Sequence, residues 1–263
     1  MATPPSSQFR DHFAQAAPAY ATFRPRYPAA LFAALAAHAP ARHLAWDCAT
    51  GTGQAAISLA DHFEQVVATD ASAAQLAAAL LHPRVRYQRA PAEASGLPAH
   101  SVALVTVAQA LHWLDRPAFY AEVRRVLVPD GVIAVWSYGL IEIGPDVDEL
   151  IRTFYDRTVG PYWPPERALV ETGYRTIDFP FAELPLPTLQ MEAALTLEQL
   201  GGYLGTWSAV LRYRVAQGRD PVPELLERVR THWGGPERPR TVRWPLATRV
   251  GRVAGASGRA GAA

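Results

Sequence analysis

Short apolar runs alternate with segments of helical periodicity through the first half of the chain. The apolar runs are rich in β-branched residues and cover 43–48, 65–70, 85–88, 101–107 and 131–136. The segments between them that suit helices are 53–61, 71–81 and 117–127. Such an alternation predicts a parallel sheet covered by helices on both faces. We therefore expect a Rossmann-like core from about residue 40 to residue 138.

The segments on either side of this core carry weaker patterns. Two alanine-rich stretches before residue 40 flank a proline-containing loop, which predicts two helices joined by a turn. After Tyr138, residues 145–159 and 196–217 have helical patterns, and 174–184 and 241–250 are candidate late strands.

Together these patterns predict an α/β fold of the Rossmann-like, doubly wound type. We expect a mostly parallel seven-stranded sheet, an N-terminal helical cap and a helical insertion in the C-terminal half. The predicted domains are a cap over 1–40, a main domain over 41–252 with a substrate-covering insertion around 145–235, and a disordered tail over 253–263.

Composition narrows the functional classes. Of the 263 residues, 49% are hydrophobic and 19% charged, as in ordinary globular proteins, and the formal net charge is only +1. We therefore expect neither nucleic acid nor a membrane as a partner. A single cysteine, Cys48, favours a reducing, cytoplasmic setting and argues against a cysteine-rich metal site. All 25 basic residues are arginines, which excludes Schiff-base chemistry and a P-loop lysine.

A glycine-rich loop follows the first predicted strand. Gly51 and Gly53 stand between that strand and a predicted helix, and Asp70 closes the second strand. This spacing is typical of nucleoside-binding sites, where glycines let the backbone approach a ligand and the acid binds ribose hydroxyls. The alternative is a tight strand–helix turn in which Asp70 only caps the next helix.

The residue before the loop helps to choose the nucleoside. A pyrophosphate on the helix N-terminus tolerates no neighbouring carboxylate, whereas a cationic sulfonium and amino group are stabilised by one. Asp47, four positions before Gly51, therefore favours S-adenosylmethionine over NAD.

The stretch 47–54 resembles motif I of class I methyltransferases, and the wider pattern resembles their type-11 branch, which includes trans-aconitate methyltransferase-like proteins. Further similar segments are 23–28, 92–93, 108–113 and 122–131, with looser similarity at 162–167 and 206–208. The resemblance implies S-adenosylmethionine as cofactor, S-adenosylhomocysteine as product and no metal.

The resemblance also implies a set of cofactor-binding residues. Their roles would be to hold the methionine end, the ribose and the adenine, and they are Asp47, Ala49, Gly51, Gly53, Asp70, Ala71, Ala92, Glu93 and Gln109. Ala49 departs from the family's usual glycine, and we expect alanine to fit there only with a negative φ. Pro91 replaces an aspartate common in relatives, so the contact with the adenine amino group passes to Glu93.

The methyl acceptor is expected to be a small organic molecule bearing, for example, a carboxylate or a hydroxyl. Methyl transfer is an in-line displacement, so positioning supplies most of the catalysis and a general base is optional. His112 is the candidate base, with a purely structural hydrogen bond as the alternative. The candidate substrate-binding residues are Tyr20, Arg26, Trp113, Tyr138, Trp163 and Trp207. For Arg26 the alternative is an interior ion pair, and for the aromatic residues it is ordinary core packing. Glu122 and Arg125 are interpreted as solvated surface charges.

Three functions remain open from the sequence. The first is a small-molecule methyltransferase, as a monomer or homodimer. The second is an NAD-dependent oxidoreductase, which Asp47 and the absence of a Tyr-x-x-x-Lys motif disfavour. The third is a methyltransferase-like binding protein without turnover.

Overall fold

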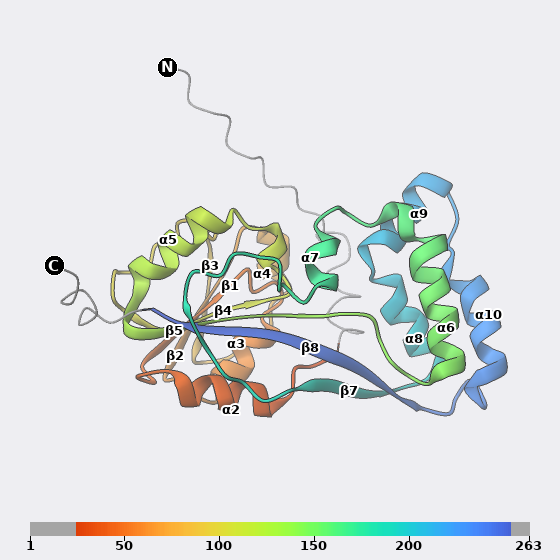
Figure 1. Cartoon of the computed structure of the whole chain (residues 1–263), viewed down its shortest axis with the longest axis horizontal. Helices are drawn as coiled ribbons and strands as arrows, with labels where there is room; N and C mark the ends of the chain where they lie inside the picture. Colours follow the sequence, from red (N-terminus) through yellow and green to blue (C-terminus); the bar gives the residue numbers. More distant parts are fainter. Residues whose placement is uncertain (1–24, 254–263) are drawn as a thin grey trace, which may run out of the picture.

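The computed structural model describes residues 25–253 and consists of a sheet covered by helices at one end and a helical cap at the other (Figure 1). The described strands form an eight-stranded sheet in the order β3-β2-β1-β4-β5-β8-β6, with β7 pairing only with β8. The strands are β1 (Leu44–Cys48), β2 (Gln65–Asp70), β3 (Val85–Arg89), β4 (Val102–Ala108), β5 (Leu127–Tyr138), β6 (Ala182–Leu184), β7 (Gln190–Leu195) and β8 (Arg240–Arg252).

The first five strands are parallel, and β8 runs antiparallel to β5, β6 and β7. In β4, every residue from Val102 to Val107 is buried, which is the pattern of a strand covered on both faces. The predicted Rossmann-like, mostly parallel α/β fold is confirmed, with seven strands along the main path and β7 beside it.

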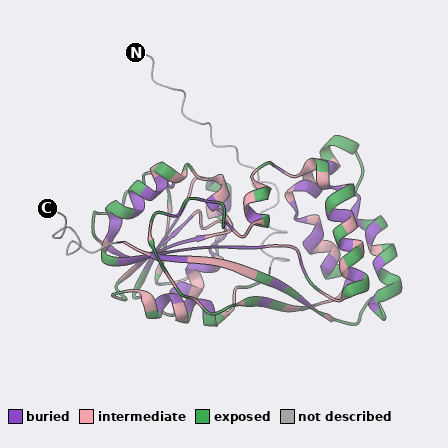
Figure 2. Cartoon of the chain, in the orientation of Figure 1, coloured by how far each residue is buried: buried purple, intermediate pink, exposed green. Residues whose placement is uncertain are grey.

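Helices cover both faces of the sheet. On one face lie α2 (Ala29–His38) and α3 (Gln54–Leu59), whose apolar residues pack with the inner side chains of β1, β2 and β4. On the other face lies α5 (Arg116–Val126), which packs with Trp46 and Val105. A short helix, α4 (Ala73–Ala77), follows β2. Figure 2 shows the buried residues of α5 facing the sheet and the exposed ones facing away.

The cap is built from the chain after β5. Its helices are α6 (Pro145–Thr153), α8 (Leu197–Gly205), α9 (Ser208–Gln217) and α10 (Val222–Trp233), and they share one hydrophobic core. A π-helical turn, η3 (Phe154–Thr158), and a 3-10 turn, η4 (Gly160–Tyr162), continue α6 toward α7 (Arg167–Glu171). The long strand β8 runs from the cap into the sheet and joins the two parts (Figure 1).

Strand order reverses between β1 and β4, because β2 and β3 lie on one side of β1 while β4 and β5 lie on the other. In parallel α/β sheets a ligand crevice opens at such a reversal, outside the carboxyl ends of the strands. These ends carry Asp47, Asp70, Gln109 and Tyr138, so the fold brings the predicted site residues to one edge.

Several predicted boundaries were wrong. The helix expected over 71–81 is limited to Ala73–Ala77, and the one over 196–217 is broken at Thr206 and Trp207 into α8 and α9. Within 174–184 only Ala182–Leu184 is a strand. Sequence patterns did not predict β7 or α10. The segment of β7 shows no clear run of apolar residues, and that of α10 is rich in charged residues.

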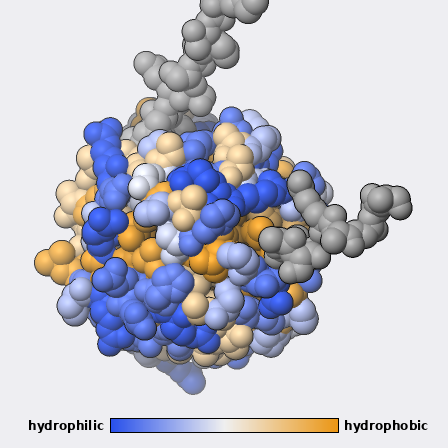
Figure 3. All heavy atoms as spheres, turned by 90° about the vertical axis from the view of Figure 1, so that its left-hand side faces the viewer, coloured by the Kyte–Doolittle hydropathy of each residue, from blue (hydrophilic) through white to orange (hydrophobic). Residues whose placement is uncertain are grey.

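Some predictions concern residues that the structure does not describe. These are the first N-terminal helix, Tyr20 and the tail after Val253. In the described range 25–253, no helix has both the length and the apolar character needed to cross a membrane. The sheet end of the molecule presents hydrophilic residues with apolar ones interspersed (Figure 3).

Candidate active site

The loop after β1 has an unusual backbone conformation. Ala49, Gly51 and Gly53 all have positive φ, at 53°, 58° and 85°. The amide of Thr50 donates to the Thr69 carbonyl at 3.0 Å, which ties the loop to β2. The prediction that Ala49 would keep a negative φ is therefore wrong. The tie to β2 imposes a left-handed turn on a residue with a Cβ, at a cost of about 1–2 kcal/mol.

Only one of the two glycines in this loop is enclosed. A Cβ on Gly53 would lie 2.1 Å from the Tyr87 hydroxyl oxygen, which itself donates to the Leu80 carbonyl. A Cβ on Gly51 would meet nothing closer than the Gln75 Oε1 atom, at 3.7 Å. Gly53 is therefore required by packing, whereas the surroundings of Gly51 leave room beside the backbone.

The Asp70 carboxylate is anchored to the loop. Its Oδ2 accepts a hydrogen bond from the Gly51 amide at 2.9 Å, and its Oδ1 accepts one from the Ser72 amide at 2.8 Å. Ser72, rather than Asp70, caps α4, because its side chain accepts from the Gln75 amide. The alternative role of Asp70 as a helix cap is thus wrong, and the carboxylate instead joins the ends of β1 and β2.

Asp47 is a fully buried carboxylate near the end of β1. Its two oxygens accept hydrogen bonds from the Thr50 hydroxyl at 2.5 Å and the Thr106 hydroxyl at 2.7 Å. Burial raises the pKa of Asp47 to about 6, against the lowering effect of the two hydroxyls. The charge of Asp70 raises it further. An ionised Asp47 is therefore costly without a cation nearby.

Acidic groups surround the adjacent thiol of Cys48. Burial raises the pKa of this buried thiol, and the charges of Asp47, Asp70 and Glu93 raise it further. The edge formed by β1, β2 and the turn after β3 therefore has a negative potential. Of the residues predicted to contact adenine, Ala92 is buried, while Ala71 and Glu93 are half-buried.

Glu122 of α5 holds the turn that carries Ala92 and Glu93. It is 6% exposed, and its Oε1 accepts from the Ser95 amide at 2.8 Å and the Ser95 hydroxyl at 2.5 Å. Hydrogen bonds from Arg125, followed by those from Ser95, lower the pKa of Glu122 to about 2. The interpretation of the pair as solvated surface charges is wrong for Glu122, which is a buried structural group, while Arg125 is exposed.

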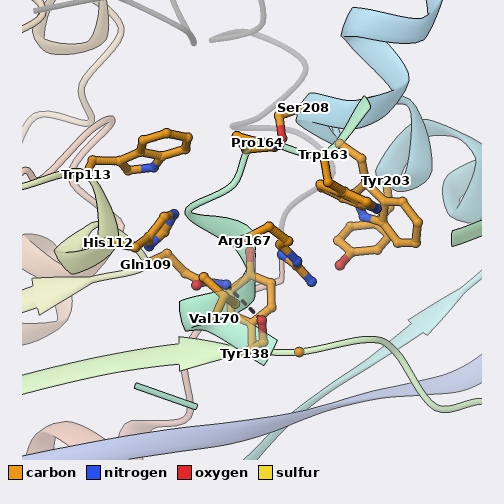
Figure 4. A pocket seen from close by; sticks show the side chains of 12 residues that line it. Gln109, His112, Trp113, Tyr138, Trp163, Pro164, Arg167, Val170, Tyr203 and Ser208 are labelled. Carbon is orange, nitrogen blue, oxygen red and sulfur yellow. Dashed lines mark hydrogen bonds between the residues drawn. The ribbon is translucent and has the colours of Figure 1, made fainter. Parts of the chain in front are cut away.

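A pocket lies beside this acidic edge, between the carboxyl ends of β4 and β5 and the cap (Figure 4). It encloses about 630 Å³ of space, part of it open to solvent. Its lining comes from four separate segments and comprises Gln109, His112, Trp113, Tyr138, Gly139, Trp163, Pro164, Arg167, Val170, Tyr203, Trp207 and Ser208. The structure thus gathers five predicted residues, His112, Trp113, Tyr138, Trp163 and Trp207, around one cavity, with Gln109 beside them.

Gln109 stands at the junction of the two halves of the site. Its φ is 55°, its amide donates to the Trp136 carbonyl at 2.9 Å, and its Nε2 donates to the Tyr138 carbonyl at 3.2 Å. A left-handed residue other than glycine or asparagine is uncommon, and such strain is concentrated at functional sites.

Arg167 is the cation of the pocket, and its side chain is fixed by aromatic residues. The guanidinium lies over the rings of Trp163 and Tyr155, with its carbon 4.7 Å and 5.3 Å from their centroids. Its Nε donates to the Tyr155 hydroxyl at 2.6 Å, and that hydroxyl donates to Glu171. No described residue accepts a hydrogen bond from its two terminal nitrogens or pairs with it as a carboxylate. Figure 4 shows Arg167 between the His112 and Trp113 side of the pocket and the Trp163 and Tyr203 side.

His112 lies in η2 (Leu111–Trp113), directly after β4. Its Nδ1 is 2.8 Å from the hydroxyl of Tyr174. Burial lowers the pKa of His112 to about 3, and the charges of Arg167 and Arg116 lower it further. The imidazole is therefore neutral throughout the physiological pH range.

The structure does not bring the predicted cation Arg26 to the described pocket, and sequence reasoning missed another cation. Arg26 is exposed, does not line the pocket and has no ion pair with a described residue. Arg167 and Tyr203 were missed, because they reach the site only through the folding of the cap. The one available signal was the segment 162–167, whose similarity to the family ends at Arg167.

Comparison with known proteins gives consistent similarities. A family model described as a methyltransferase domain matches residues 46–135. A Dictyostelium discoideum protein that carries the name of a methyltransferase is 33% identical over 228 residues, covering 85% of this chain and 87% of that protein. A Saccharomyces cerevisiae protein named as a probable S-adenosylmethionine-dependent methyltransferase is 30% identical over 145 residues, covering 52% of this chain and 50% of that protein.

A solved structure from Anaeromyxobacter dehalogenans, named as a type II methyltransferase, is 49% identical. It superposes with a TM-score of 0.84 and covers 89% of this chain and 99% of that chain. The names of these three proteins specify no methyl acceptor.

Proposed function

This chain belongs to the S-adenosylmethionine-dependent methyltransferases, and we propose that it methylates a carboxylate oxygen of a small organic acid. Family membership removes the oxidoreductase alternative. The choice of acceptor is supported by one observation above all: in the pocket, the guanidinium of Arg167 has no carboxylate partner among the described residues.

The acidic edge fits the cofactor. Bound there, S-adenosylmethionine would supply an electrophilic methyl group on a positively charged sulfur. Its sulfonium and ammonium groups are cations, which the potential of Asp47, Asp70 and Glu93 favours. The open backbone at Gly51 and the anchored Asp70 suit the close approach of a nucleoside. We propose that Ala49, Gly53, Ala71, Ala92 and Gln109 complete this side.

The pocket favours an anionic acceptor. A guanidinium presents a planar pair of donors that matches a carboxylate. Within residues 25–253, only the Nε of Arg167 is used, by the Tyr155 hydroxyl, so its terminal nitrogens can form such a pair. The positive charge of Arg167 would repel a cationic acceptor. Such an acceptor also could not stack on the face of Trp163 where the guanidinium already lies.

A carboxylate is favoured over a hydroxyl because it needs no base. An organic acid is ionised at neutral pH, so no proton has to leave its attacking oxygen. A hydroxyl acceptor must lose a proton, but the described lining contains no carboxylate to take it, and the lowered pKa of His112 makes its imidazole a weak base. Trp113, Tyr138, Trp163 and Trp207 would form the apolar walls that hold the acceptor in line.

The test is an assay of methyl transfer to a panel of small organic acids, each paired with its primary amide and with the amine and the alcohol that carry –CH2NH2 or –CH2OH in place of the carboxylate. The matched amide keeps the shape of the acid and removes the charge. We expect turnover with one or more acids, a methyl ester as product, and no reaction of the matched amide. Preferential turnover of amines or neutral hydroxyl compounds would overturn the proposed acceptor class.

A further inference from the structure

The hydroxyl of Tyr174 lies in a hydrogen-bonding arrangement that constrains His112. Tyr174 is fully buried, and its hydroxyl oxygen is 2.8 Å from His112 Nδ1. Among the described residues, His112 Nδ1 is the only hydrogen-bond partner of this hydroxyl. The phenol stays protonated, because burial raises its pKa far above the physiological range.

Counting protons at this oxygen settles the direction of the bond. A phenolic oxygen accepts two hydrogen bonds at most and donates one. If Nδ1 carried a proton and donated it to the phenol, the buried O–H group of Tyr174 would have no described acceptor, and an unpaired buried donor is costly. The phenolic proton therefore points to Nδ1, which acts as the acceptor. A neutral imidazole whose Nδ1 accepts carries its proton on Nε2.

We infer that Tyr174 is a positioning residue that fixes His112 as an Nε2–H donor toward the acceptor oxygen, rather than as a general base. Nε2 lies on the side of the ring away from Nδ1, and His112 lines the pocket that also contains Arg167 (Figure 4). The described part of the pocket would then offer an acceptor two sets of donors, from Arg167 and His112, and no carboxylate that takes up a proton. This inference rests on the proposed function only for the identity of the oxygen that Nε2–H contacts.

The backbone around Tyr174 supports a positioning role. Gly173 and Tyr174 both have left-handed φ values, 60° and 61°, although the second carries a large side chain. Arg249 stabilises this conformation by donating to the carbonyls of Tyr174 and Ile177, at 3.0 Å and 2.6 Å. A conformation that is unfavourable for a tyrosine is thus maintained at the position that delivers its hydroxyl to His112.

The tautomer can be measured directly by nitrogen NMR on the full chain labelled with ¹⁵N-histidine. We expect the Nδ1 resonance of His112, assigned by its loss in His112→Gln, to be that of an unprotonated nitrogen and Nε2 that of a protonated one. In Tyr174→Phe the two resonances should move toward each other as both tautomers become populated. Tyr120→Phe is the matched control, since this buried tyrosine donates its hydroxyl to the Asp178 carbonyl instead, and it should leave the resonances unchanged.

A protonated Nδ1 in the wild-type protein would overturn the inference. So would a Tyr174→Phe protein with an unchanged His112 spectrum. If Tyr174→Phe fails to fold, the wild-type spectrum alone decides. These spectra need no acceptor, so they hold even if no organic acid proves to be a substrate.

Steady-state kinetics with an acid from the panel distinguish the two possible roles of His112, as a hydrogen-bond donor or as a general base. His112→Phe should lower kcat/KM by about 10- to 100-fold, the effect of losing a hydrogen bond to a charged group. His112→Gln places an amide N–H near the position of Nε2 and should recover most of this loss. Equal losses in the two variants would contradict the donor role.

Discussion

The loop after β1 and the pocket beside it differ in charge. They also differ in the kind of structure that holds their functional groups in place. At the loop, the buried carboxylate of Asp47 and the half-buried one of Asp70, which accepts from the Gly51 amide, create a negative site on a constrained backbone. In the pocket, side chains from four segments surround the cation Arg167 and the neutral His112. The two sides thus suit reactants of opposite charge. The difference indicates that loop substitutions should act through folding and cofactor binding, and pocket substitutions through the acceptor.

The largest effect on stability is expected at Gly53. An alanine there combines a left-handed φ with a Cβ against the Tyr87 hydroxyl, and should destabilise the fold by about 3 kcal/mol. Gly51→Ala is the matched control, since it meets no close contact and should cost only about 1 kcal/mol. Urea unfolding of both variants measures the difference. Equal costs would mean that conformation alone, and not packing, requires glycine at position 53.

The next effect concerns Asp47, whose ionisation destabilises the protein without its ligand. The pKa is raised from 3.8 to about 6, so the ligand-free fold loses stability as the pH rises through that interval. Asp47→Asn should therefore be more stable at pH 8 by about 1–3 kcal/mol. Its affinity for S-adenosylhomocysteine, which keeps the ammonium group, should be lower by about 10- to 100-fold.

Thermal unfolding and calorimetry test the two halves of this prediction separately. Asp115→Asn is a suitable control, because this exposed residue caps α5 and asparagine caps equally well. A variant at position 47 that is less stable at pH 8 and binds the cofactor normally would show that the charge serves another purpose.

A smaller effect is expected at Glu122, which holds the turn carrying Ala92 and Glu93. Because its pKa is lowered from 4.5 to about 2, its ionised form stabilises the fold above pH 4.5, and this stabilisation is lost as the pH falls toward 2. Glu122→Gln should cost about 2 kcal/mol at pH 7 and less at pH 3, by urea unfolding. The exposed Glu149→Gln should change stability at neither pH. A pH-independent loss at position 122 would assign the effect to packing.

The loop was predictable from sequence because its parts are close together and depend on residue types. Gly51 and Gly53 predict a tight backbone turn, and Asp70 is an acid at a strand end. The parallel pairing of β1 and β2 then brings the turn and the acid together. The φ of Ala49 was not predictable, since it depends on the bond from Thr50 to β2. A local pattern contains no information about a contact of that kind.

The pocket could be predicted only in part. Tyr138 is the last residue of β5, and His112 and Trp113 come shortly after β4, so the fold itself brings them to the site. Arg167 follows a π-helical turn and a 3-10 turn, and its position depends on Tyr155 and Glu171. Arg26 was chosen because it lies in a family-like segment, but its side chain is exposed. Residues positioned by cap packing leave no periodicity in the sequence.

The most direct test of the account is kcat/KM for an organic acid in Arg167→Met, measured beside the affinity for S-adenosylhomocysteine. Arg124→Met is the control, because Arg124 also lies over an aromatic ring, that of Phe181, outside the pocket. We predict that Arg167→Met lowers kcat/KM by about 100-fold or more while cofactor affinity and the control variant stay near wild type. Unchanged kcat/KM in Arg167→Met would contradict the assignment of this pocket to an anionic acceptor.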